Sequence, residues 1–306
     1  MITQTITAPD NPPIIYPYQT QVFEQLGRIA RTCANVSRSA IPIRLATAHL
    51  IIGPTGTGKT HLAKAVAAES GMPFLSISVS DWILLGSSNR GGTQTWPVLL
   101  DFIERNLGEP GVIIFIDEID KCYHDSNWNT FLRTEIFSVC DGRVPPGLCD
   151  TDGDAVSPQR ARRVAEYLAN KTLVLGGGAF QHLWDCPGRM IGFTGGAESS
   201  GIPDPDALAS TLPRELIGRF SSRLLVLPSP NEADYHAMLD TMAPQIPEHW
   251  RTSFLRIGRR EVSDAVRLRK GARFVGDTLF QAMIEDRTHT PPPPERVPDS
   301  ALGASV

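Results

Sequence analysis

Short apolar runs alternate with helical segments along most of the chain. Three runs, 50–52, 112–116 and 172–175, contain almost no polar residues, which is typical of strands buried on both faces of a parallel sheet. Two further strands are predicted at 72–79, where apolar and small polar residues alternate, and at 223–227. Helices are predicted around these strands at 19–35, 61–69, 96–106, 127–140, 160–169 and 212–220. This alternation predicts an α/β fold in which helices flank a parallel sheet.

The pattern changes after residue 228. Pro228 and Pro230 predict a hinge, and Asn231 is a good N-cap for the helix that should follow. The remaining residues up to about 287 show helical periodicity, whereas the Pro-rich end of the chain predicts a disordered tail. We therefore expect an N-terminal arm at 1–17, a large α/β domain at 18–228, a small α-helical lid domain at 229–287 and a tail at 288–306.

One loop fits the phosphate-binding pattern G-x-x-x-x-G-K-[ST]. It comprises Gly53, Pro54, Thr55, Gly56, Thr57, Gly58, Lys59 and Thr60. The loop lies between a predicted strand and a predicted helix, where free N–H groups and the positive end of the helix dipole favour a polyphosphate. Lys59 is expected to reach the β- and γ-phosphates of ATP, Thr60 to ligate Mg²⁺, and His61 to lie beside the nucleotide. The alternative is a Gly-rich turn that binds nothing.

Two carboxylates follow the predicted central strand. Asp117 and Glu118 come directly after the apolar run 112–116, and the carboxyl ends of parallel strands are where open α/β sheets place their ligands. Asp117 is positioned to hold the Mg²⁺ shell, and Glu118 to orient and deprotonate an attacking water. An acidic, solvated loop is the alternative interpretation. It becomes weaker because a phosphate loop precedes the pair in the same predicted sheet.

Composition and charge narrow the class of protein. The 306 residues carry a net charge of −4, so no overall basic field would attract nucleic acid. The five cysteines form no C-x-x-C pair, which argues against a zinc module and favours reduced thiols in a cytosol-like compartment. No signal peptide and no apolar run of membrane-spanning length is evident. We expect a cytoplasmic protein with no membrane partner.

Five motifs in this order resemble those of the AAA+ ATPases, and most closely those of the ClpX/HslU unfoldase branch. They are the phosphate loop, Ile-Asp-Glu-Ile-Asp-Lys at 116–121, Gly-Gly-Ala-Phe at 177–180, Glu-Leu-Ile-Gly-Arg at 215–219 and Gly-Ala-Arg at 271–273. The resemblance implies a homo-oligomer, usually a hexameric ring, that hydrolyses ATP at subunit interfaces to remodel a macromolecule. An open spiral is the other assembly that we consider.

The resemblance also implies roles for single residues outside the two central motifs. Arg219 matches the arginine finger, which would neutralise charge on the γ-phosphate of a neighbouring subunit, and Arg223 is a second candidate for an interface arginine. Arg273 matches the lid arginine called sensor 2, which would touch the nucleotide. Tyr16, ahead of the first strand, is a candidate for contact with the adenine. An ion pair for Arg219, a solvated helix face for Arg273 and core packing for Tyr16 are the alternatives.

Departures from the family pattern leave the function open. The loop 86–92, which in the unfoldases grips polypeptide with an aromatic residue, has no aromatic here, and Arg90 is its longest side chain. Gly176 and Gly177 occupy the expected sensor-1 position after the fourth strand. We consider an ATP-driven remodeller of a protein substrate or adaptor first. A DNA-associated regulator or loader, favoured by Arg90 and the basic stretch 256–273, and an ATP-binding switch of low turnover are the alternatives.

Overall fold

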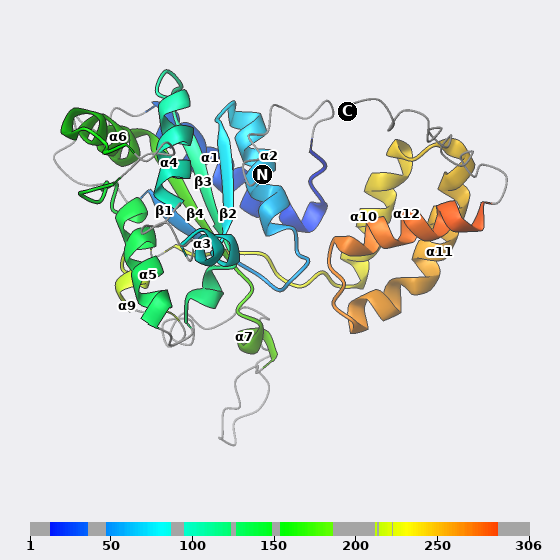
Figure 1. Ribbon diagram of the computed structural model, residues 1–306. Coiled ribbons are helices and arrows are strands. Elements are labelled where there is room, and N and C mark those ends of the chain that lie inside the picture. Colours follow the sequence, from blue (N-terminus) through cyan, green and yellow to red (C-terminus); the bar gives the residue numbers. More distant parts are fainter. Residues whose placement is uncertain are drawn as a thin grey trace, which may run out of the picture.

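The computed structural model describes residues 13–35, 47–86, 95–123, 127–148, 154–185, 212, 214–221 and 223–286. A sheet with helices on both faces and a smaller group of three helices form its two parts (Figure 1). The first part contains η1 (Pro17–Gln19), α1 (Thr20–Asn35), β1 (Ala48–Ile52), α2 (Lys59–Ser70), β2 (Phe74–Ser78), α3 (Val79–Gly86), α4 (Thr95–Arg105), β3 (Val112–Asp117), η3 (Ile119–Tyr123), α5 (Asn127–Cys140), α6 (Pro158–Lys171), β4 (Thr172–Gly178), α7 (Gln181–Asp185), α9 (Arg214–Ile217) and β5 (Leu225–Val226).

The five strands are all parallel and lie in the order β2-β3-β4-β1-β5. This confirms the predicted α/β fold. Because parallel strands end at the same edge of a sheet, the loop after β1 and the loop after β3 both lie at its carboxyl edge. Strand β4, paired with both β1 and β3, separates them. The phosphate loop and the acidic pair are thus brought to one edge although 57 residues separate Thr60 from Asp117.

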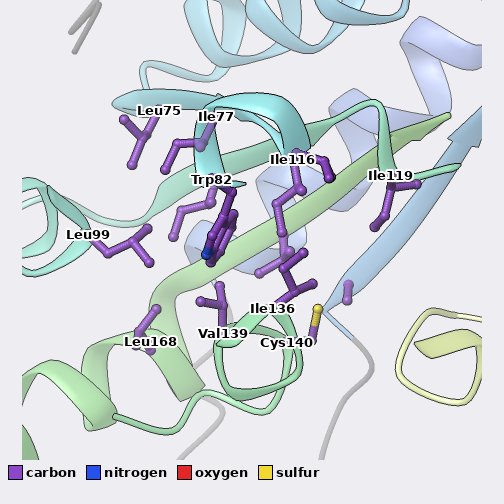
Figure 2. Packing of buried hydrophobic residues seen from close by; sticks show 14 of the residues in the cluster. Leu75, Ile77, Trp82, Leu99, Ile116, Ile119, Ile136, Val139, Cys140 and Leu168 are labelled. Atoms are coloured by element: carbon purple, nitrogen blue, oxygen red, sulfur yellow. The ribbon is translucent and has the colours of Figure 1, made fainter. Parts of the chain in front are cut away.

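Both faces of the sheet are apolar, as the uninterrupted runs predict. Alternate residues of β3 enter two different cores, with Ile114 and Ile116 on the face covered by α3 to α6, and Ile113 and Phe115 on the face covered by α1 and α2. Figure 2 shows Trp82 of α3 inserted into the first of these cores. Its ring is fully buried, and its indole N–H donates to Oε2 of Glu135 at 2.7 Å. The sheet edge is therefore a rigid support for the loops that follow its strands.

The smaller part is built from α10 (Glu232–Met242), η4 (Ala243–Gln245), α11 (Glu248–Arg267) and α12 (Arg273–Glu285). Asn231 caps α10 as predicted, accepting a hydrogen bond from the N–H of Asp234 at 3.0 Å. A separate core includes Tyr235, Phe254 and Phe274. Tyr16, from the opposite end of the described chain, belongs to the same core. The segment before α1 therefore packs on the helical domain, and the predicted boundary at residue 17 stays a prediction.

Strand β4 differs from its prediction in a way that changes the site. It continues to Gly178, so Gly176 and Gly177 are buried within the strand and do not follow it. A Cβ on Gly177 would lie 2.5 Å from the ring of Phe115, which explains why glycine is needed in the strand. The predicted strand end at residue 175 is therefore wrong, because three glycines continue the strand, and the sensor-1 role of Gly176 and Gly177 stays a prediction.

Other boundaries shifted less. The predicted strand at 223–227 is limited to Leu225–Val226, and the predicted helix at 212–220 to Arg214–Ile217. The loop with Arg90 and the tail at 288–306 lie outside the described residues. Within the described part of the chain, no helix combines the length and the apolarity needed to cross a membrane.

Candidate active site

The phosphate loop leads from β1 directly into α2. Gly56 and Gly58 have φ angles of +87° and +91°, a region that favours glycine, so glycine is required by the backbone at these two positions of the loop. Gly58 is the N-cap of α2 and has no side chain with which to cap the helix. The first N–H groups of a helix have no acceptor within it. They are consequently free to bind an anion, as the sequence predicts.

A cavity of 810 Å³ opens above this loop. It is lined by residues of the phosphate loop, the acidic motif, the N-terminal segment and the lid, among them Ile14, Tyr16, Thr55, Gly56, Gly58, Lys59, Thr60, His61, Asp117, Glu118 and Arg273. The structure thus brings together most of the predicted site residues. Among the predicted loop residues, Gly53, Pro54 and Thr57 are buried and are not part of the cavity lining, and the Pro54 carbonyl accepts from Lys59.

Thr60 and Asp117 meet at the base of the cavity. The Thr60 hydroxyl donates to Oδ2 of Asp117 at 2.5 Å. A hydroxyl and a carboxylate oxygen this close are a suitable pair of ligands for Mg²⁺, which binds oxygen and keeps several waters. The residues present therefore fit the expected ion, and Mg²⁺ would supply charge neutralisation on the phosphates when bound.

Lys59 is buried beside the glycine-rich turn. Its Nζ donates to the carbonyl oxygens of Gly53 at 2.7 Å and Pro54 at 3.1 Å. Burial lowers its pKa below the usual value, while the nearby carboxylates of Asp117 and Asp120 act in the opposite direction. A polyphosphate in the cavity would favour the charged ammonium.

Glu118 lies at the mouth of the same cavity in a strained backbone conformation, with φ at +58°. Its N–H donates to Oδ1 of Asp117 at 2.9 Å, which fixes the two acidic residues relative to one another. Its carboxylate accepts from Lys121 Nζ at 2.7 Å and from the Ser80 hydroxyl at 3.2 Å. Glu118 can act as a base toward a water only when at least one carboxylate oxygen is turned toward the cavity.

Three predicted arginines have different surroundings. Arg273 lies at the start of α12 and lines the cavity, as expected for a residue that touches the nucleotide from the lid. Arg219 does not line it. Its guanidinium is held by Asp141 at 3.1 Å and stacks 4.4 Å from the ring centroid of Phe137. The ion pair given as the alternative for Arg219 is thus present in the single chain.

Arg223 is the freer of the two candidate interface arginines. Its side chain is exposed and makes no ion pair in the part of the chain that the structure describes. It borders a second cavity of 600 Å³, together with Arg28 and His49, away from the phosphate loop.

Residues 49–138 match the family described as "ATPase family associated with various cellular activities (AAA)". This segment is an AAA ATPase domain. It includes the phosphate loop, both carboxylates and the first three strands of the sheet in sequence order. The AAA match confirms ATP with Mg²⁺ as the cofactors and supports ATP hydrolysis by this domain.

Curated proteins similar to this segment include bacterial proteases. The chain is 44% identical over 86 residues to an "ATP-dependent zinc metalloprotease FtsH" of Alkalihalophilus pseudofirmus, covering 27% of this chain and 11% of that protein. It is 47% identical over 75 residues to FtsH 2 of Alkaliphilus metalliredigens, covering 23% and 10%. It is 37% identical over 105 residues to FtsH of Mycobacterium bovis, covering 33% and 13%. The similarity thus spans about a tenth of each relative's length.

Several residues that form the site were not predicted from the sequence. Asp120 accepts from the N–H groups of Ala179 and Phe180 at 3.1 and 3.4 Å, and so attaches the end of β4 to the acidic motif. Lys121 and Asp120 were inside a quoted motif, which was a usable signal. Ser80, Tyr18 and Gln19 belong to no site motif. Only the folded chain brings Ser80 to Glu118, and Tyr18 and Gln19 to the Thr57 carbonyl.

Proposed function

We propose that this chain is a subunit of an ATP-driven AAA machine that remodels a protein partner. The observation that carries the proposal is the hydrogen bond of 2.5 Å between Thr60 and Asp117, with Glu118 adjacent, at the base of an 810 Å³ cavity. That arrangement is suited to a Mg²⁺-bound triphosphate and a water activated by a carboxylate. The FtsH relatives, named as ATP-dependent proteases, support a protein as the partner. Membership of the ClpX/HslU branch remains a proposal that rests on motifs alone.

The proposed machine is a homo-oligomer, hexameric ring or spiral, in which one subunit completes the site of the next. We infer that Arg223 supplies the guanidinium in trans, with Arg219 as the second candidate. The exposed side chain of Arg223 needs to break no described ion pair to reach a neighbour, whereas Arg219 would have to leave Asp141 and Phe137. Separating charges already paired in a partly buried place costs free energy that the new contact must offset.

Substituting Arg223→Ala is expected to lower kcat for ATP at least tenfold while the Kd for ATP changes less than threefold. An arginine from a neighbour stabilises charge that develops in the transition state, so its loss affects turnover more than binding. Arg219→Ala is expected to lower the thermal midpoint through loss of the Asp141 pair, with a smaller effect on kcat. Steady-state ATPase assays, nucleotide titration and thermal melting measure the three quantities.

Mixing distinguishes action in trans from action in cis. Arg223→Ala subunits retain a phosphate loop, and Lys59→Ala subunits retain the arginine, so a mixture should recover part of the wild-type rate per subunit. No recovery in mixed oligomers, or an equal loss of binding and turnover in Arg223→Ala alone, would contradict the proposal. If Arg219→Ala gives the kcat loss and the recovery, the roles of the two arginines are exchanged.

A trap variant tests the class of partner. Glu118→Gln with ATP is expected to hold the machine in its ATP-bound form, so that a protein substrate is retained on affinity purification in the presence of ATP and released with ADP. Lys59→Ala is the matched control because it should retain nothing in an ATP-dependent way. ATP-dependent retention of DNA or RNA that is lost on nuclease treatment, with no retained protein, would favour the nucleic-acid alternative.

One observation weakens the DNA-associated alternative. Cations of the stretch 256–273 are paired with carboxylates of the same domain: Arg256 with Glu285, Arg259 with Asp240, Arg260 with Glu261, Arg267 with Asp264 and Lys270 with Asp277. These five ion pairs weaken the positive potential that the stretch could offer to a phosphate backbone. The low-turnover switch keeps one supporting observation, the ion pair of 2.7 Å between Glu118 and Lys121.

A further inference from the structure

The peptide between Thr57 and Gly58 is held from outside the phosphate loop. The Tyr18 hydroxyl donates to the Thr57 carbonyl at 2.8 Å, and the Gln19 side-chain amide donates to the same oxygen at 2.8 Å. Gln19 is completely buried, and its own carbonyl accepts from the N–H of Tyr16 at 3.1 Å. Burial raises the pKa of Tyr18, so its hydroxyl stays protonated and remains a donor. Two hydrogen bonds thus hold the Thr57 carbonyl, and a third positions the Gln19 side chain that donates one of them.

The orientation of that carbonyl decides where the next N–H group points. In a trans peptide the C=O and the N–H lie on opposite sides of one plane. With the Thr57 carbonyl bound by Tyr18 and Gln19, the N–H of Gly58 points the other way, and in the described part of the chain it has no acceptor. Gly58 lines the cavity and has φ at +91°. Because glycine allows both signs of φ, this peptide could flip if nothing held it.

The lid holds the neighbouring peptide in the same manner. The N–H of Ala272 donates to the Gly56 carbonyl at 2.8 Å, and the N–H of Gly271 donates to the Tyr235 hydroxyl at 2.8 Å. The ring of Tyr16 packs in the core with Tyr235 and lies parallel to the ring of Tyr18, with centroids 6.4 Å apart. The lid turn and the N-terminal segment therefore contact two consecutive carbonyls of the loop and are joined to each other.

We propose that Tyr18 and Gln19 are positioning residues that lock the Thr57–Gly58 peptide with its N–H directed at the β-phosphate of the nucleotide. They do not touch the nucleotide through this contact but act through the loop backbone. The inference rests on the proposed nucleotide site and goes beyond it, because it assigns phosphate selectivity to the segment ahead of α1. The close fit supports a dedicated contact: a Cβ on residue 58 would lie 2.4 Å from Nε2 of Gln19.

The test compares ADP with AMP, because AMP lacks the β-phosphate that the loop amides cradle. Tyr18→Phe removes one donor and is expected to weaken ADP binding about fivefold, and Gln19→Met about tenfold, with AMP affinity changed less than twofold. Isothermal titration of the full chain gives these constants. Tyr167→Phe is the matched control, since the Tyr167 hydroxyl also donates to a main-chain carbonyl, that of Glu109 at 3.1 Å, but far from the loop.

A purely structural role gives a different result. It would lower the thermal midpoint in all three variants and leave the ratio of ADP to AMP affinity as in the wild type. An unchanged ratio in Tyr18→Phe and Gln19→Met would overturn the proposal. If Gln19→Met does not fold, Tyr18→Phe alone carries the test because it removes a single oxygen atom. If the wild-type chain binds neither nucleotide, it is the proposed nucleotide site that fails, and the two failures are thereby distinguished.

Discussion

Replacing Glu118 with glutamine is expected to lower kcat for ATP by a factor of about 10² to 10⁴. Glutamine keeps the size and one carbonyl oxygen of the side chain but cannot take a proton from water. The loss corresponds to roughly 3–5 kcal/mol of transition-state stabilisation. ATP binding should persist or become tighter, because the substitution removes a negative charge next to the phosphates while Thr60, Asp117 and the loop amides are unchanged.

The expected split between binding and turnover is what distinguishes a base from a structural carboxylate. ATP affinity is measured by titration, and turnover by phosphate release under saturating ATP. Glu166→Gln, on the exposed side of α6, is the matched control and should have wild-type values for both quantities. Turnover within threefold of the wild type in Glu118→Gln would show that another group activates the water.

The ion pair with Lys121 adds a second expectation to the same site. The ammonium and the Ser80 hydroxyl both contact Oε2 of Glu118, so an attacking water would have to be held by the other carboxylate oxygen while these contacts persist. The pair is about half exposed at both ends, so it is weak and can be broken when a nucleotide or a neighbouring subunit enters the cavity. Low basal turnover that rises on assembly is compatible with this geometry.

The features that could be predicted from the sequence are those formed by consecutive residues. The phosphate loop is eight consecutive residues whose geometry follows from its glycines, and the strand before Asp117 is recognisable by its apolar residues alone. Parallel strands then bring Thr60 and Asp117 to one edge without further information. The fold class and the base of the cavity can therefore be predicted from the sequence alone.

The rest depends on contacts between distant segments. Gln19 reaches Thr57 across 38 residues, and Asp141 reaches Arg219 across 78 residues, with no motif at either first residue. The three glycines of β4 resemble a loop in sequence, yet they continue the strand. The rings of Phe220, Phe115 and Phe180 occupy the space where side chains of residues 176, 177 and 178 would stand. Such packing depends on residues that are distant in the sequence, and a local sequence pattern does not contain them.

Replacing Lys59 with alanine is expected to weaken ATP binding about tenfold to a hundredfold and to abolish measurable turnover. A charged hydrogen bond is worth about 1.5–3 kcal/mol, and Lys59 is the buried cation of the phosphate loop. Its loss also leaves the carbonyls of Gly53 and Pro54 without the ammonium that they now share, so the loop loses part of its internal support.

Lys64→Ala, which removes the same charge from the same helix at a position that does not line the cavity, is the control and should bind ATP normally. The comparison separates a local contact from the general effect of net charge on an anionic ligand, because both variants change the charge by one. If both lysines were equivalent, or if Lys59→Ala bound and hydrolysed ATP as the wild type does, the triphosphate could not lie in the amide cradle at the start of α2. In that case the proposed function and the role assigned to Tyr18 and Gln19 would fail together. A loss of ATP binding in Lys59→Ala but not in Lys64→Ala is the result expected if this loop binds the triphosphate.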